Sequence, residues 1–412
     1  MHDPRFIYKC TDCGKEFSTS EVMYLCPACS RQNTANAPLF GVLGILYDYD
    51  HIKKTTPEFD DLKRNNFASL LPIRNIENLP SLRVGNTPLY SSVRPDGKPL
   101  PFRVHLKDDS QNPTWSFKDR ASALVSAYAM ENKLDTIVTA STGNAGSSIA
   151  GICASQNQKA VVIVPEKAPV AKLTQIIMYG ATIVPIKGTY DEAFDLSIKA
   201  TGEFGWYNRN TAYNPLTVEG KKTVSFEIFE QLQFKVPERI FVPVGDGVII
   251  AAVYKGFEDL LKLNMFDSMP VVVAVQAEGS DNLVRNLNSE YFRIIQSVTV
   301  ADSISVDVPR NFHMARKFIH KYEGEAITVS DEEIIAASSV LSKSTGLFAE
   351  PAGAAAFAGL LSYIQDGKIG DDSDNVVLLT GSGLKDLKPL TTKLSIPQAV
   401  DPSIENLKKL RI

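Results

Sequence analysis

Segments rich in apolar and β-branched residues alternate with helix-like segments along most of this chain. The strand-like segments are residues 102–107 (FRVHLK), 136–140 (TIVTA), 160–165 (AVVIVP), 181–188 (ATIVPIKG), 239–245 (RIFVPVG), 271–279 (VVVAVQAEG) and 375–383 (NVVLLTGSG). Strands that are apolar along their whole length are typical of parallel sheets with helices on both faces. The sequence therefore predicts an α/β protein with two sheet-forming halves.

Length and charge narrow the class of function. The chain has 412 residues and exceeds the roughly 250–300 residues at which a single core stops growing, so several compact units are expected. A net charge of -4 without a basic run argues against binding to nucleic acid or to an anionic membrane surface. The sequence contains neither a secretion signal nor a run approaching the roughly 18 apolar residues of a membrane span. We expect a cytoplasmic protein that acts on a small molecule.

Four cysteines lie close together near the N-terminus, as the pairs Cys10/Cys13 and Cys26/Cys29. Each Cys-x-x-Cys turn directs two thiolates toward one point, and two such turns complete a tetrahedral zinc site. The alternative is a pair of disulfides or redox thiols, which a reducing cytosol disfavours. Because four thiolates leave no open coordination position, we predict a structural Zn²⁺ ribbon over residues 1–36.

Small residues follow two of the predicted strands, where ligands of open α/β sheets bind. In the STGN turn, Ser141 to Asn144, backbone N–H groups could approach a carboxylate and Asn144 could donate a hydrogen bond. In the VGDG turn, Gly245 and Gly247 would allow backbone amides to hold a phosphate, which Asp246 would repel unless it points away or pairs with a cation. Ordinary helix capping and a plain strand-to-helix turn are the alternatives.

Two further strand-end turns carry polar side chains. Thr380 follows the apolar strand at 375–379 and could bond a buried ligand, although a structural role is the alternative. Glu350 precedes Pro351, which suits the first position of a helix. We expect Glu350 to interact with the dipole of that helix rather than with a ligand.

Lys118 ends the stretch NPTWSFKDR at residues 112–120, just before a small-residue helix. A single lysine is ordinarily a solvated surface charge. A reactive lysine, an amide donor, a phosphate cradle and a hydroxyl at successive strand ends would together suit one ligand, pyridoxal phosphate.

The ordered motifs resemble those of the threonine synthase family and, more broadly, of the fold type II (tryptophan-synthase-β-like) pyridoxal-phosphate enzymes. They are the four-cysteine segment, VGNTPL (84–89), NPT-SFKDR, STGN, NPLTVEGKKT (214–223), VGDG, EPAGAAA and TGSGLKD. The resemblance implies two three-layer α/β domains with the cofactor between them, preceded by the ribbon. The larger domain would comprise 37–114 and 236–412, and the smaller one 115–235. By analogy it also implies a homodimer.

The resemblance assigns roles to individual residues. Lys118 would hold the cofactor covalently and later carry protons, because burial between the domains lowers its pKa. The other cofactor contacts would be Phe117 beside the ring, Asn144 at the phenolic oxygen, the backbone of Gly245, Asp246, Gly247, Val248 and Ile249 at the phosphate, and Thr380 at the pyridine nitrogen. The amino-acid substrate would contact Ser141, Thr142, Gly143, Asn144, Ala145 and Trp115.

The departures from the family pattern concern the substrate. Trp115 replaces a glycine and should reshape the pocket, and Ala145 replaces a hydroxyl residue. The family's substrate-phosphate ligands align with Thr211, Ala212 and Thr217, so a serine and an arginine are missing. Arg209, Lys221 or Lys222 could compensate, but the sequence does not position them.

Three functions remain open from the sequence. The leading reaction is conversion of O-phosphohomoserine to threonine and phosphate. The alternative is a lyase or β-replacement enzyme for an unphosphorylated amino acid, of the Ser/Thr ammonia-lyase or O-acetyl amino acid synthase type, which Thr217 favours. A catalytically silent binding protein is the third, and intact Lys118, Asn144 and Thr380 argue against it.

Overall fold

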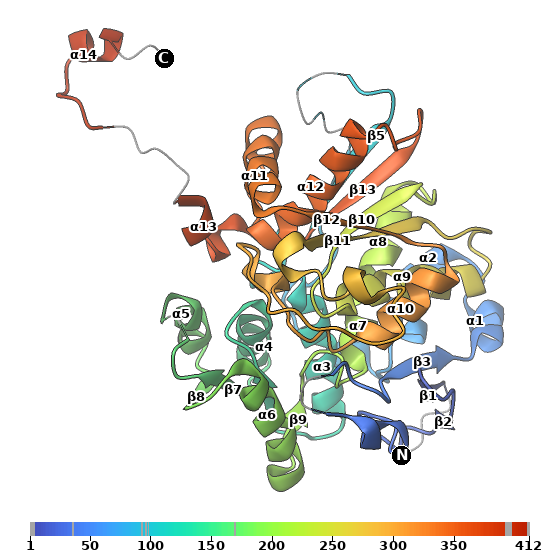
Figure 1. Ribbon diagram of the computed structural model, residues 1–412. Coiled ribbons are helices and arrows are strands. Elements are labelled where there is room, and N and C mark those ends of the chain that lie inside the picture. Colours follow the sequence, from blue (N-terminus) through green and yellow to red (C-terminus); the bar gives the residue numbers. More distant parts are fainter. Residues whose placement is uncertain are drawn as a thin grey trace.

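The computed structural model of the chain describes residues 5–34, 37–91, 94, 97, 99–168, 170–391 and 398–409. Its strands form three sheets, and Figure 1 shows the largest of them above the other two. The two larger sheets are parallel except for one short edge strand, and helices cover them. The predicted α/β class is confirmed.

The largest sheet has six strands, in the order β12-β11-β10-β13-β5-β4. Its strands are β4 (Leu89–Tyr90), β5 (Arg103–Asp108), β10 (Arg239–Pro243), β11 (Val271–Ala277), β12 (Glu325–Val329) and β13 (Asp374–Leu379). On β10, Ile240 and Val242 pack in the same core as Ile250 of the helix that follows, whereas Phe241 packs with Phe357 on the opposite face. Because side chains alternate along a strand, this sheet forms the middle of three layers.

The smaller parallel sheet has the order β8-β7-β6-β9. Its strands are β6 (Thr136–Ala140), β7 (Lys159–Pro165), β8 (Thr182–Ile186) and β9 (Tyr207–Asn208). Ile137 packs with Ile149 on one face, and Val138 packs with Phe194 on the other. This sheet is also covered on both faces.

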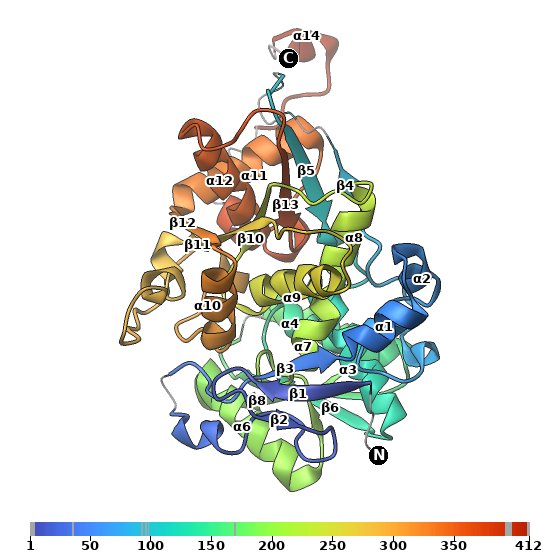
Figure 2. The same cartoon turned by 90° about the vertical axis from the view of Figure 1, so that its right-hand side faces the viewer.

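The third sheet is antiparallel. Cys10 ends its middle strand, and Cys13 lies in the turn that follows. The sheet consists of β1 (Phe6–Cys10), β2 (Glu16–Phe17) and β3 (Leu43–Tyr47), with β1 in the middle. Every residue of β1 pairs with β3, from Phe6 with Tyr47 to Cys10 with Leu43. The N-terminal sheet therefore continues beyond residue 36, the boundary that the cysteine spacing suggested (Figure 2).

Helices connect the strands in the order expected for crossover connections. They are α1 (Tyr49–Thr55), α2 (Phe59–Arg64), α3 (Lys118–Glu131), α4 (Asn144–Ser155), α5 (Val170–Met178), α6 (Tyr190–Phe204), α7 (Leu216–Lys221), α8 (Thr223–Gln231), α9 (Val248–Lys262), α10 (Phe312–Lys321), α11 (Asp331–Thr345), α12 (Pro351–Gln365), α13 (Lys388–Thr391) and α14 (Ile404–Lys409). Local signals set several boundaries. For example, α11 begins at a capping box of Ser330 and Glu333 and ends at Gly346, which has φ 76°. Among the described helices, none is long and apolar enough to cross a membrane.

Candidate active site

The stretch NPTWSFKDR is anchored to the loop that follows β13. The Phe117 N–H donates to the Thr380 carbonyl at 2.9 Å, and the Trp115 carbonyl accepts from the Ser382 N–H at 3.1 Å. On the other side of this loop, the Glu350 N–H donates to the Gly381 carbonyl at 3.0 Å. Three motifs that are far apart in the sequence thus meet immediately before α3.

Lys118 is the first residue of α3 and is partly accessible. Its ammonium group makes no hydrogen bond or ion pair with other residues in the described ranges. Removal of water by the surrounding protein lowers its pKa; Glu350 and Asp246 oppose this shift, and Arg209 adds to it. A lysine in these surroundings is readily available as a neutral amine.

The VGDG turn connects β10 to α9, and its two glycines lie close against neighbouring segments. A Cβ on Gly245 would lie 3.0 Å from the Ile304 Cα, and one on Gly247, which has φ 83°, would lie 3.0 Å from the Ala315 Cβ. The Ala251 N–H donates to the Gly247 carbonyl, so the N–H groups before it have no partner within the helix. The turn therefore offers backbone donors to an anion.

Asp246, within this turn, directs its carboxylate to a neighbouring segment. Its Oδ1 accepts from the Arg310 N–H at 3.2 Å, and its carbonyl accepts from the Asn311 N–H at 2.9 Å. Burial raises the pKa of Asp246, which the Arg310 contact opposes. The Asp246 side chain therefore points away from the place where the turn could bind a phosphate, toward the 309–312 turn.

Asn144 is the first residue of α4 and is held by a buried carboxylate. Its Nδ2 donates to both Glu350 oxygens, at 2.9 and 3.0 Å, and to Ser303 Oγ at 3.1 Å. Glu350 is the N-cap residue of α12, but its side chain makes no capping bond and contacts Asn144 instead; its expected interaction with the helix dipole stays a prediction. Burial raises the pKa of Glu350, and the bond from Asn144 opposes that shift.

A cavity of about 320 Å³ opens beside these groups. Its lining residues are Trp115, Thr142, Gly143, Asn144, Ser147, Thr174, Gln175, Asp302, Ser303, Glu350, Leu384, Lys385 and Asp386. Ser141 and Ala145 flank the lining residues of the STGN turn without belonging to the lining. The STGN turn, the Asn144–Glu350 pair and the end of the TGSGLKD motif thus line one cavity.

Trp115 stands at the edge of this cavity with an exposed fraction of 53%. Its φ of 65° lies in the left-handed region, which glycine adopts without strain. The expected narrowing of the pocket is therefore confined to its edge.

Lys385 is a cavity residue that the sequence reasoning did not single out. Its Nζ donates to Ser147 Oγ at 2.8 Å and to Gln175 Oε1 at 2.7 Å. Burial lowers its pKa to about 8. The signal available was its place in TGSGLKD, immediately after the strand-end glycines.

Of the positions that align with the family's substrate-phosphate ligands, two supply no group for that task. Thr217 donates its hydroxyl to the Asn214 carbonyl at 2.8 Å, and Ala212 is a buried residue with φ 63°. Lys222 is ion-paired with Glu219 and Asp259 and is thereby occupied.

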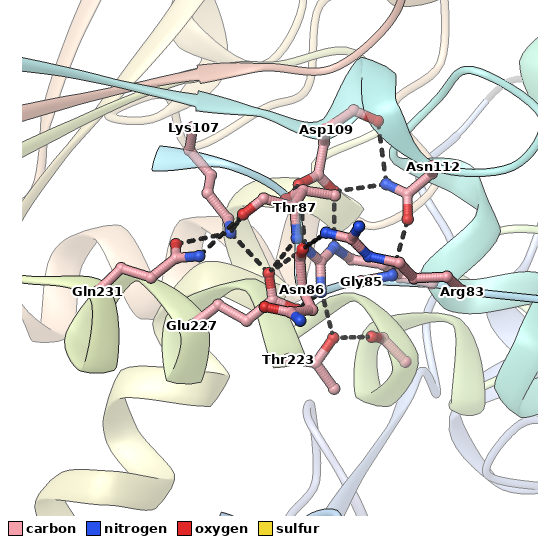
Figure 3. Close-up of polar contacts among 12 residues, drawn as sticks. Arg83, Gly85, Asn86, Thr87, Lys107, Asp109, Asn112, Thr223, Glu227 and Gln231 are labelled. Carbon is pink, nitrogen blue, oxygen red and sulfur yellow. Dashed lines mark hydrogen bonds and ion pairs between the residues drawn. The ribbon is translucent and has the colours of Figure 1, made fainter. Parts of the chain in front are cut away.

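Arg120, two residues after Lys118, belongs to a separate buried network. Figure 3 labels its partners Asp109 and Glu227. Its guanidinium donates to Asp109 Oδ2 and to Glu227 Oε1, each at 2.6 Å. Lys107 donates to Glu227 Oε2 at 2.6 Å and to the Thr87 carbonyl at 2.7 Å. This network ties the VGNTPL segment to α3 and α8.

The four sulfur atoms of Cys10, Cys13, Cys26 and Cys29 all lie within 4.8 Å of one another, with Cys13 and Cys26 3.9 Å apart. Gly41 packs against the second pair, and a Cβ there would lie 3.1 Å from the Cys26 carbonyl. The separation of the sulfurs is compatible with a shared tetrahedral metal ion.

Comparison with known proteins places this geometry in context. Residues 80–381 match the family model described as pyridoxal-phosphate dependent enzyme. A threonine synthase of Methanosarcina acetivorans is 36% identical over 97% of each chain. A threonine synthase of Methanocaldococcus jannaschii is 33% identical over 98% of this chain and 99% of its own.

Solved structures of the same fold include enzymes with other names. A threonine deaminase from Solanum lycopersicum gives a TM-score of 0.65 at 22% identity, covering 83% of this chain and 94% of its own. A maize serine racemase also gives a TM-score of 0.65 at 22% identity, over 76% of this chain and 92% of its own. These likenesses concern the fold, whereas the family match and the two relatives extend to the sequence. The chain belongs to the threonine synthase family of pyridoxal-phosphate dependent enzymes and is a lyase of that type.

Proposed function

We propose that this chain converts O-phosphohomoserine into threonine and inorganic phosphate. The observation that carries the proposal is its similarity, over 97–98% of its length, to two proteins named threonine synthase. The solved structures with the same fold bear the names of deaminases, racemases and a synthase, so the fold alone does not select the substrate.

The residues fit pyridoxal phosphate. The glycine turn before α9 leaves little space for a Cβ and offers backbone N–H groups, which suits the cofactor's phosphate. Lys118, without a partner in the described chain, suits the covalent attachment, with Phe117 beside it and Thr380 bonded to the same turn. When bound, the cofactor supplies an electron-withdrawing ring that stabilises negative charge on the amino acid.

Side chains that line the cavity would bind the substrate, and Lys118, which is not among the lining residues, would move its protons. Lys118 Nζ, with its lowered pKa, would accept a proton from the substrate carbon and return it later. Asn144 would donate a hydrogen bond, held in position by Glu350 and Ser303. The N–H groups of Thr142, Gly143 and Asn144 would receive the substrate carboxylate, with Trp115 bounding the pocket.

We further propose that the four cysteines hold a structural Zn²⁺, because their sulfurs lie close enough to share one tetrahedral ion. The cofactor would lie between a larger domain, 37–114 with 236–412, and a smaller domain, 115–235. Cytoplasmic location and a homodimeric state also belong to this proposal as predictions from the sequence.

A second candidate is a lyase or β-replacement reaction on an unphosphorylated amino acid. The observation that favours it is the Thr217 hydroxyl, which bonds to its own helix where the family has an arginine. A phosphate dianion without a charge-assisted partner would lose about 1.5–3 kcal/mol for each missing contact.

A product assay separates the two candidates. The cofactor-loaded protein is incubated with O-phosphohomoserine, serine, threonine and O-acetylserine, and phosphate, ammonia, 2-oxo acid and amino-acid products are measured. Formation of threonine with equal phosphate supports threonine synthesis. Ammonia or a replacement product from an unphosphorylated substrate, without turnover of O-phosphohomoserine, supports the second candidate.

A further inference from the structure

Two fully buried cations near Lys118 have no carboxylate partner. Arg209 and Lys221 are each 1% exposed. Arg209 Nη2 makes no hydrogen bond, and Lys221 makes no hydrogen bond or ion pair within the described ranges. Buried charges are ordinarily paired, so these two are candidates for binding an anion.

The fold brings both cations to the first turns of α3. Arg209 follows β9, and its Nε donates to Ser122 Oγ at 3.3 Å, one helical turn after Lys118. Lys221 ends α7, whose Gly220 packs so tightly on α3 that a Cβ would lie 2.3 Å from the Arg120 carbonyl. Burial and the charges of Arg209 and Lys118 lower the pKa of Lys221.

Lys221 also has a specific relation to the missing arginine. It lies four residues after Thr217 on α7, and residues four apart share one face of a helix. The neighbouring Lys222 is occupied by Glu219 and Asp259. Three cations could compensate for the arginine that is missing at position 217. With Lys222 paired, Arg209 and Lys221 remain available.

The cofactor's phosphate has a separate cradle. The N-terminus of α9 and its glycine turn offer backbone N–H groups, whereas Arg209 and Lys221 come from the segment after β9 and from α7. A second bound anion would supply the partner that these two cations lack. The Asp246 carboxylate, which lies close enough to influence the pKa of Lys221, is directed to Arg310 instead.

We propose that Arg209 and Lys221 form the subsite that binds the phosphate group of the substrate, in place of the family's arginine and serine. This inference rests on the proposed function, because it requires a phosphorylated amino acid. The chemistry of the subsite is that of a dianion held by one guanidinium and one ammonium in a site shielded from water.

The first test uses the cofactor-loaded protein and inorganic phosphate as the probe, with melting temperature measured at constant ionic strength. The cofactor occupies its own cradle, so stabilisation by added phosphate reports a second site. We expect Arg209→Met and Lys221→Met to weaken the apparent affinity for phosphate about 10- to 100-fold. Arg209→Lys, which keeps the charge, should recover part of it.

Lys222→Met is the matched control, because it removes a buried lysine from the adjacent position. It should lower the melting temperature, since it removes one of the two ion pairs of Asp259 and the ion pair of Glu219, and should keep the response to phosphate. Lys221→Met should not lower the melting temperature, because it leaves no carboxylate unpaired. Loss of the phosphate response in Lys222→Met alone would overturn the proposal.

A second test separates the two phosphates. Cofactor affinity is measured by absorbance titration of each variant, and KM is measured for O-phosphohomoserine. A KM raised about 10- to 100-fold with unchanged cofactor affinity supports the subsite. Weakened cofactor affinity with an unchanged phosphate response of the loaded protein assigns the cations to the cofactor and overturns it.

The outcomes also distinguish this inference from the proposed function. Suppose that the parent protein does not turn over O-phosphohomoserine but that its response to phosphate disappears in Arg209→Met and Lys221→Met. The subsite is then supported and threonine synthesis is contradicted. If the parent protein makes threonine and both variants keep its KM for O-phosphohomoserine, threonine synthesis is supported and the subsite is contradicted.

Discussion

Lys118 and Arg120 lie two residues apart at the start of α3 and belong to opposite kinds of charge cluster. Arg120 contacts Asp109, Glu227 and Thr223, and with Lys107 forms a network in which two cations face two carboxylates (Figure 3). Lys118, Arg209 and Lys221 have no such partners among the described residues. Because positions i and i+2 point to nearly opposite sides of a helix, one turn serves both clusters.

Charges in the Arg120 cluster stabilise the fold by pairing with each other. Charges in the Lys118 cluster have no carboxylate partner in the described part of the chain and are available to bind a ligand. In the paired network, Arg120 and Lys107 overcome the effect of burial and lower the pKa of Glu227 to about 2. In the unpaired cluster, burial prevails and lowers the pKa of Arg209 to about 10. Each cluster should therefore respond to mutation in its own way.

The largest expected effect is on catalysis, at Lys118. Lys118→Ala removes the proton-transfer group, and activity should fall by at least about 10²- to 10⁴-fold. Because no ion pair is broken, the melting temperature of the cofactor-free protein should not fall. Steady-state kinetics and thermal unfolding check the two parts, and a variant that keeps its activity would remove Lys118 from the mechanism.

The next effect is on stability, in the paired network. Arg120→Met leaves Asp109 and Glu227 buried without their shared partner, which should destabilise the protein by about 3–5 kcal/mol. Thermal and urea unfolding measure the loss. Arg103→Met is the matched control, because Arg103 bonds both Asp374 oxygens but is about half exposed, so a much smaller loss of stability is expected. Equal losses in the two variants would contradict the distinction.

Much of the fold was accessible from the sequence because its central strands are apolar throughout. The predicted segment at 136–140 is β6, and the one at 239–245 contains β10. Strand β12, which lies at a sheet edge with mostly half-buried residues, gave no comparable signal and was missed. The pairing of β1 with β3 was missed as well, because the cysteine spacing says nothing of residues beyond the second pair.

The site was predictable where a motif follows a strand and unpredictable where contacts cross the chain. STGN and VGDG open α4 and α9 as expected. Glu350 stands at the start of its own helix, as its local position indicates, but its hydrogen bond from Asn144, 206 residues away, gave no signal in the sequence. The sequence also could not distinguish the adjacent Lys221 and Lys222. Only the structure shows that Lys222 has ion-pair partners and that Lys221 has none among the described residues.

A smaller effect concerns pH. The pKa of Lys221 is lowered in the folded protein, so the unfolded chain binds more protons and stability rises with pH between the lowered pKa and about 10.4. For Glu227, whose pKa is lowered to about 2, the contribution is present above about 4.3 and is lost as pH falls toward 2.

Lys221→Met should therefore reduce the alkaline rise in the free energy of unfolding by up to about 1.4 kcal/mol per pH unit, which flattens the rise in melting temperature, and should leave the acid side unchanged. Glu227→Gln should change the acid side instead. Melting temperatures of the cofactor-loaded variants between pH 4 and 10 measure both slopes. If the melting temperature of Lys221→Met rises with alkaline pH as steeply as that of the parent protein, the charge of Lys221 is compensated in the folded protein.

The smallest effect concerns backbone strain at the edge of the cavity. Trp115 has φ 65°, a conformation that costs a residue with a Cβ about 1–2 kcal/mol, and the family has glycine at this position. Trp115→Gly should consequently be more stable than Trp115→Ala by about 1 kcal/mol, although alanine ordinarily loses less entropy on folding. At Trp206, which is not among the residues with positive φ, the order should reverse. Unfolding of the four variants measures both differences, and an alanine variant as stable as the glycine variant at position 115 would show that no strain is stored there. If the strain is present, the chain accepts a less favourable backbone to hold an indole beside the substrate loop, so Trp115→Gly should also change which amino acids the cavity admits.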